Sequence, residues 1–120
     1  FQLLGKASHN MVLLPQNNDS YITLTQEELN EFNYTKGDTE GVVNYGLSIK
    51  GVNLTAIFIE NKAENIIKIS FRSQGDVDVN SFARKHFNGG GHVNAAGGKS
   101  LDNMEDTINK FVRILAEENN

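Results

Sequence analysis

The residues best suited to chemistry are gathered in the run 89–98, which holds five glycines, one histidine (His92) and almost nothing bulky. Glycine has no Cβ, so it lets a phosphate or carboxylate approach the backbone N–H groups closely. Successive amides beside one imidazole N–H predict a cradle, or nest, for phosphate. A helix C-cap glycine followed by a flexible turn explains the same composition, and the pattern alone leaves both interpretations open.

Arg72 and Ser73 form a second candidate, because they stand at the end of an expected strand. A guanidinium there can clamp a phosphate through two parallel hydrogen bonds, and a hydroxyl adds a further donor. A surface ion pair between Arg72 and Asp76 or Asp78 is the simpler interpretation. The segment 37–41 (GDTEG) is either a carboxylate-bearing loop at the rim of a site or the capped start of a helix.

The sequence offers no complete set of catalytic or metal-binding residues. His9, His86 and His92 are its only histidines, and none stands at a spacing typical of a metal site. There is no cysteine and no Gly-x-Ser-x-Gly elbow, and the glycine run lacks the Lys and Ser/Thr of a Walker loop. We therefore expect this chain to bind a ligand without a metal, cofactor or activated nucleophile of its own.

Composition indicates one globular domain, with 120 residues of which 38% are hydrophobic and 22% charged. A net charge of −4 argues against a broad electrostatic grip on nucleic acid, so any phosphate must be bound locally. The lack of cysteine, of a bilayer-length apolar run and of a secretion signal favours a cytoplasmic protein without a membrane partner. The first residues, FQLLGK, look like the middle of a longer polypeptide.

Strand and helix signals alternate along the chain and predict an α/β domain with a mixed β-sheet flanked by helices. The expected strands cover residues 11–14, 21–24, 52–60, 65–72 and 95–99. The expected helices run from Thr25 to about Phe32, from Asp38 or Thr39 to Gly51, over 79–87, and from near Asp102 onward, with Glu105 in a capping-box position.

Two local patterns are specific enough to place side chains. Thr25 and Glu28 have the spacing of a capping box, in which each side chain accepts a hydrogen bond from the other residue's backbone N–H. Strand 65–72 alternates, because strand side chains repeat every two residues. Its apolar face carries Ile67, Ile69 and Phe71, and its polar face carries Lys68, Ser70 and Arg72.

Segments 71–80 (FRSQGDVDVN) and 89–98 (GGGHVNAAGG), with Phe82 and Ala83 between them, resemble the DHH-associated domain of DHH phosphoesterases. Segment 38–45 (DTEGVVNY) resembles the branch of bacterial oligoribonucleases (nanoRNases), which also act as pAp phosphatases. The resemblance begins near Tyr21. It predicts that residues 1–18 are a residual linker and first strand from a truncated N-terminal region, and that residues 19–120 are the substrate-binding domain.

The resemblance also implies what lies outside this chain. Family members carry an N-terminal DHH domain with two metal ions, usually manganese, and no Asp-His-His triplet occurs here. The isolated chain is therefore expected to be inactive and to close over that domain, gripping the phosphate of a short oligonucleotide or phosphorylated nucleotide. The implied phosphate ligands, through amides, an imidazole, a guanidinium and polar side chains, are Arg72, Ser73, Gly89, Gly90, Gly91, His92 and Asn94.

Other functions stay open at this point. The chain resembles nucleic-acid-binding modules of alanyl-tRNA synthetases and RecJ-type exonucleases, and its glycine run can also serve only to pack against a partner domain. Cyclic dinucleotide phosphodiesterases and polyphosphate-cleaving enzymes share the predicted architecture. All phosphate-binding interpretations require Arg72 and the glycine run to face the same side of the molecule.

Overall fold

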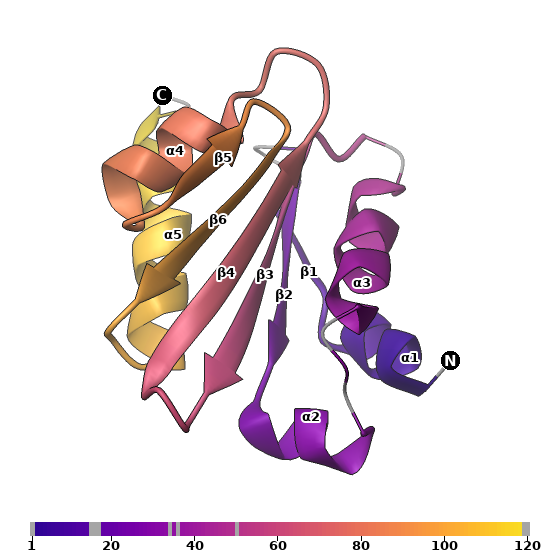
Figure 1. The fold of residues 1–120 in the computed structure, drawn as a ribbon. Coiled ribbons are helices and arrows are strands. Elements are labelled where there is room, and N and C mark those ends of the chain that lie inside the picture. The colour runs from indigo at the N-terminus through magenta and orange to yellow at the C-terminus, as the bar shows by residue number, and fades with distance from the viewer. Residues whose placement is uncertain (1, 15–17, 34, 36, 50, 119–120) are drawn as a thin grey trace.

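A six-stranded mixed sheet forms the centre of the computed structural model and has helices on both faces (Figure 1). The structure describes residues 2–14, 18–33, 35, 37–49 and 51–118. The strands are β1 (Val12–Leu14), β2 (Asp19–Leu24), β3 (Leu54–Asn61), β4 (Ile66–Ser73), β5 (Gly90–His92) and β6 (Ala95–Ser100). The helices among these residues are α1 (Gln2–His9), α2 (Gln26–Glu31), α3 (Asp38–Leu47), α4 (Val79–His86) and α5 (Met104–Glu118).

The strand order across the sheet is β1-β2-β3-β4-β6-β5. β2 and β3 run parallel, and all other neighbouring strands run antiparallel. The prediction of a mixed α/β sheet flanked by helices is confirmed, and the expected β3–β4 hairpin is present. Two elements were not predicted, the N-terminal helix α1 and the short edge strand β5.

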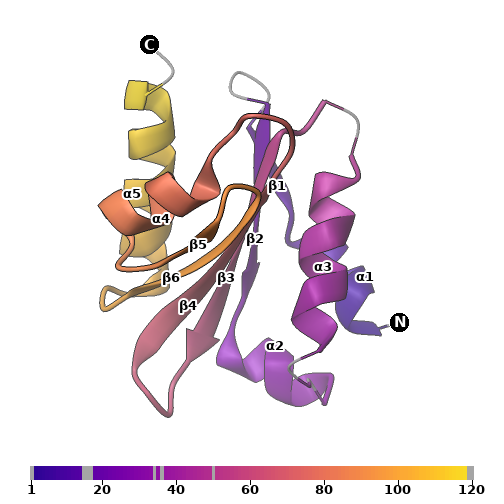
Figure 2. The ribbon, with the colours of Figure 1, turned by 45° about the horizontal axis from the view of Figure 1, so that its top comes forward.

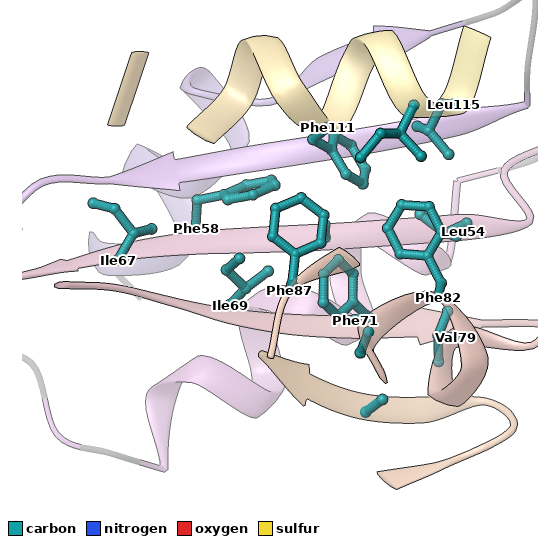
Figure 3. Packing of buried hydrophobic residues seen from close by; sticks show 14 residues of the cluster. Leu54, Phe58, Ile67, Ile69, Phe71, Val79, Phe82, Phe87, Phe111 and Leu115 are labelled. Atoms are coloured by element: carbon teal, nitrogen blue, oxygen red, sulfur yellow. The ribbon is translucent and has the colours of Figure 1, made fainter. Parts of the chain in front are cut away.

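One face of the sheet packs on α4 and α5 around a cluster of phenylalanines (Figure 3). Phe58 of β3 meets Phe111 of α5 edge-to-face, with ring centroids 5.1 Å apart. Phe71 of β4 lies against Phe82 of α4 at 5.6 Å. Edge-to-face pairs of this kind add to the free energy gained by burying the rings. This cluster fixes which side of β4 faces inward, and so sends Arg72 to the opposite side.

The second face is covered on one half only. Helices α1 and α3 lie together on this side of the sheet, opposite α4 and α5 (Figure 2). They pack over β2 and β3 through the buried side chains of Leu3, Ala7, Ile22, Leu24, Val42, Val43, Ile57 and Ile59. Over β4 and β6 the same face carries Lys68, Ser70, Arg72, Ala95, Gly97 and Lys99, all half-buried or exposed.

The start of α2 follows the predicted capping box. Thr25 Oγ1 accepts from the Glu28 backbone N–H at 3.2 Å, and Glu28 Oε1 accepts from the Thr25 N–H at 2.9 Å. The start of α5 lies one residue later than the expected cap at Asp102. Asn103 Oδ1 accepts from the Asp106 N–H at 2.8 Å, because an asparagine caps a helix as well as an aspartate does.

The expected cap of α3 is wrong. The N-cap position belongs to Gly37, and neither Asp38 nor Thr39 occupies it. The carboxylate of Asp38 instead accepts from the Thr35 backbone N–H at 3.0 Å, which closes the turn before the helix. α3 therefore begins without a side-chain cap and depends on the packing of its buried face for stability.

Candidate functional site

The glycine-rich run folds as a β-hairpin, and the amide nest expected from its composition is not what the chain forms. Strands β5 and β6 lie side by side and pair antiparallel (Figure 1). Register places His92 opposite Ala95. The Gly89 N–H donates to the Ala83 carbonyl at 3.2 Å, and the Gly91 N–H donates to Asn80 Oδ1 at 2.8 Å. Two of the three amides expected to bind phosphate therefore have acceptors inside the fold.

The C-cap interpretation of the glycine run is also wrong. The left-handed residue that follows α4 is Asn88, with φ 53°, and the glycines come after it. Asparagine adopts this conformation more readily than other non-glycine residues. No glycine of the run takes the left-handed cap position, although the Gly89 N–H satisfies the Ala83 carbonyl in the last turn of α4. Close packing of backbone accounts for most of the glycines.

Three of these glycines have neighbours that exclude any side chain. A Cβ added to Gly89, Gly91 or Gly98 would lie 1.9, 2.6 or 2.8 Å from a backbone oxygen. Gly97 differs, because its added Cβ would meet only the Ile69 carbonyl oxygen, at an ordinary 3.5 Å. The fold itself therefore requires glycine at positions 89, 91 and 98. Gly97, by contrast, leaves bare a sheet surface that could have carried a side chain.

Arg72 and His92 lie in one cross-strand row on one face of the sheet. Register pairs Arg72 with Ala95, and Ala95 with His92. Residues directly opposite each other in antiparallel strands point to the same face. Two strand spacings, roughly 10 Å, separate the two backbones. Only the methyl group of Ala95 stands between them, so the guanidinium and the imidazole flank an open stretch of sheet.

Arg72 is held by a carboxylate from α3. Its Nη2 lies 2.7 Å from Oε2 of Glu40, its Nε donates to Oε1 at 3.4 Å, and its Nη1 donates to the Phe71 carbonyl at 2.9 Å. The expected pairing with Asp76 or Asp78 is wrong, because these residues follow the end of β4 and lead into α4 on the other face. Segment 37–41 thus begins a helix and also supplies a carboxylate beside the guanidinium.

Ser73 and Asn94 contact each other and not the open face. The buried Ser73 donates from Oγ to the Val77 carbonyl at 2.6 Å and accepts from Asn94 Nδ2 at 2.9 Å. Asn94 also donates to the Gly75 carbonyl at 3.2 Å. These bonds tie the tip of the β5–β6 hairpin to the loop after β4, which fixes His92 relative to Arg72. A direct contact of either side chain with phosphate stays a prediction.

One carboxyl group with a strongly shifted pKa was missed by the sequence analysis. Asp19, at the start of β2, is only 6% exposed, and burial raises its pKa to about 7. It lines a separate cavity of about 560 Å³ with Asn53, Ser81 and Lys85. Shifted pKa values often mark functional sites. An acidic residue two positions before the expected strand 21–24 was the available signal. This cavity lies on the α4 and α5 side, away from Arg72.

Asp78, at the rim of the same cavity, has a structural role. Its pKa lies below the usual value because the Ser81 backbone N–H and the Ser81 hydroxyl both donate to its carboxylate.

Within the part of the chain that the structure describes, no group of three or more His, Asp or Glu side chains is placed to hold a metal ion. None of the described helices is long and apolar enough to cross a membrane.

Comparisons with known proteins give the family of the chain. Residues 18–118 match the model of the DHHA1 domain family. The sequence is 33% identical over 104 residues to the probable bifunctional oligoribonuclease and PAP phosphatase NrnA of Streptococcus mutans, which covers 85% of this chain and 33% of the relative. The chain therefore spans about a third of that curated relative.

Solved structures show the same fold. An exopolyphosphatase-related protein from Bacteroides fragilis matches with a TM-score of 0.90 and 41% identity, over 97% of this chain and 34% of that one. The pGpG-specific phosphodiesterase PggH from Vibrio cholerae matches with a TM-score of 0.62 and 12% identity, over 98% of this chain and 38% of that one. At so low an identity the second likeness concerns the fold alone.

Proposed function

Because the chain belongs to the DHHA1 domain family, we propose that it is the substrate-binding domain of a DHH-family phosphoesterase that hydrolyses nucleotide phosphoesters. The proposed substrates are short oligonucleotides and pAp, since the Streptococcus mutans relative is named for both activities. The proposed partner is a DHH domain of the same polypeptide, consistent with relatives about three times as long as the matched segment. A cytoplasmic location stays a prediction.

The observation that supports this proposal most strongly is the row formed by Arg72, Ala95 and His92. The planar guanidinium of Arg72 can pair with two phosphate oxygens, and the imidazole N–H of His92 can donate to a third. Glu40 is 58% exposed, and ion pairs with an exposed partner are worth little, so a phosphate can displace its carboxylate from Arg72.

The steps of this chain are binding and orientation. Two manganese ions are proposed for the DHH domain, where metal-activated water is the usual chemistry of such centres. The described residues of this chain do not fit such ions, because they contain no ligand cluster. Arg72 and His92 hold the phosphate group and fix its direction of approach. Positioning of this kind accounts for several kcal/mol of a reaction barrier in favourable cases.

The proposal is tested by titrating the chain and two variants with AMP, followed by amide chemical shifts. We expect Arg72→Ala and His92→Ala each to weaken binding about tenfold, the size of one hydrogen bond to a charged group. In the wild type, the amide signals of Gly90 and His92 should shift during the titration. The exposed Lys85 of α4 provides the control Lys85→Ala, which should bind AMP as the wild type does.

We call the pair of Arg72 and His92 the clamp. Unchanged dissociation constants for AMP in both Arg72→Ala and His92→Ala would refute it. The same pair of substitutions in the full two-domain protein should lower kcat/KM for short oligonucleotides by about tenfold or more, since the clamp acts on the bound phosphate.

A further inference from the structure

The open half of the sheet carries a second row of positive charge. On the face that bears Arg72, register places Ser70 opposite Gly97, and Lys68 opposite Lys99. Strands rise about 3.3 Å per residue, so the lysine row lies four residues, or about 13 Å, from the row of Arg72. Ser70 and Gly97 occupy the step between the two rows.

The opposed lysines Lys68 and Lys99 lower the stability of the sheet when no ligand is bound. Lys68 and Lys99 are both exposed and directly opposite, and like charges in that position destabilise a sheet. Lys68 has a partner in Glu64 at 3.2 Å, but both side chains are more than half exposed, and such pairs contribute little. Lys99 makes no ion pair with the described residues. The row therefore presents one weakly paired and one unpaired ammonium group, on a chain whose net charge is −4.

A shallow groove of about 440 Å³ lies over this row. Its lining includes Lys68, Ser70, Gly90, Gly97 and Lys99. Gly97 forms part of the floor, and packing within the chain does not require a glycine there, since an added Cβ would have an ordinary contact at 3.5 Å. A bare floor bordered by two ammonium groups fits a flat or extended anionic chain better than a single small ion.

We propose that this groove is a second anion subsite, which takes a phosphodiester of a single-stranded oligonucleotide whose terminal phosphate lies between Arg72 and His92. The inference rests on the proposed function and narrows it. Phosphates of a stacked strand follow one another at ~3.4 Å along its axis. The two rows therefore span about three to five nucleotides, and fewer than that when the strand is extended. A bisphosphorylated mononucleotide, with both phosphates on one ribose, does not reach both rows.

The test compares AMP with tetraadenylate that carries a 5′-phosphate, on the wild-type chain and on Lys68→Gln/Lys99→Gln. The tetranucleotide should bind the double variant five- to tenfold more weakly at low salt, and the slope of log K against log salt should fall by about 1.4, for two lost contacts. AMP should bind within twofold of the wild type, because its one phosphate stays between Arg72 and His92.

The matched control is Lys85→Gln/Arg113→Gln, which removes the same charge from α4 and α5 on the opposite face. Both ligands should bind it within twofold of the wild type. Unchanged tetranucleotide affinity in the lysine variant would overturn the subsite. The subsite would also be overturned if the lysine variant lost as much affinity for AMP as for the tetranucleotide, or if the control variant lost as much affinity as the lysine variant. Either result would mean that the effect comes from the overall charge of the protein.

A second variant tests the floor without removing charge. Gly97→Ala places one methyl group in the groove and should weaken the tetranucleotide at least threefold, with AMP affinity unchanged. The outcomes separate the two proposals. If Arg72→Ala and His92→Ala both bind AMP normally, the proposed function fails. If only the lysine and Gly97 variants bind the tetranucleotide normally, the second subsite fails and the clamp stands.

Discussion

Two halves of one sheet face differ sharply in this molecule. Ile57 of β3 and Ser70 of β4 are directly opposite in register, as are Ile59 and Lys68. Ile57 is fully buried beneath the helices on that side, whereas Ser70 is half-buried and Lys68 is exposed. The change from buried to exposed side chains occurs between two adjacent strands of one hairpin. Neither strand propensity nor distance along the chain explains this change.

The contrast between the covered and the open half separates residues that stabilise the fold from residues that contribute little to its stability. On the covered half, apolar side chains gain free energy by leaving water. On the open half, the opposed lysines and the bare Gly97 gain nothing from the chain's own packing. The buried core of this face therefore lies on one half, and the residues proposed to bind ligand lie on the other. Substitutions on the two halves should have different effects.

The largest effect is expected from a fold-required glycine. Gly89→Ala would place its Cβ 1.9 Å from the Gly97 carbonyl oxygen, a backbone atom that cannot move without separating the strands. We expect a loss of more than about 3 kcal/mol in the free energy of unfolding, or failure to fold. Gly97→Ala should change it by less than about 0.5 kcal/mol. Urea denaturation measures both, and equal effects would contradict the division of the glycines.

The next comparison uses a pair that is opposite in register. Ile57→Ala removes a fully buried side chain and should cost about 2–5 kcal/mol, since the cavity left behind adds to the lost burial. Ser70→Ala, one strand away on the same face, should stay within about 0.5 kcal/mol. Similar losses in urea denaturation would mean that the open half also contributes to the core.

Local patterns in the sequence were sufficient for much of the fold. The alternation of Ile67, Ile69 and Phe71 assigned both faces of β4 correctly, because strand periodicity depends only on neighbours along the chain. The capping box of Thr25 and Glu28 was equally local. Helix α1 was missed because a short helix gains its stability from packing, here through its buried Leu3 and Ala7, and not from its own composition.

The sequence named candidate residues for the site but did not give their arrangement. A run of glycines has the same composition in an amide nest as in a tightly packed hairpin, and the distinction depends on backbone atoms across the fold, such as those against Gly89. The partner of Arg72 was also out of reach, because Glu40 lies 32 positions earlier in the chain. Only the register of β4, β6 and β5 brought Arg72 and His92 into one row.

The smallest expected effect concerns the contact that joins the two halves. Glu40 belongs to α3, which covers β2 and β3, and its carboxylate holds the guanidinium of the open half at 2.7 Å. If phosphate displaces that carboxylate, removal of its charge should favour binding. Glu40→Gln should therefore bind AMP about two- to fivefold more tightly, because an ion pair with an exposed partner is worth up to ~1 kcal/mol.

Glu105→Gln provides the control for Glu40→Gln, because this substitution removes the same charge. Glu105 is an exposed residue in the first turn of α5. Its AMP affinity should equal that of the wild type. Weaker binding by Glu40→Gln would mean that the carboxylate orients Arg72 toward the phosphate and does not compete with it. In that case the covered half would contribute to the site as well as to stability, and the division between the two halves would hold only for the lysine row.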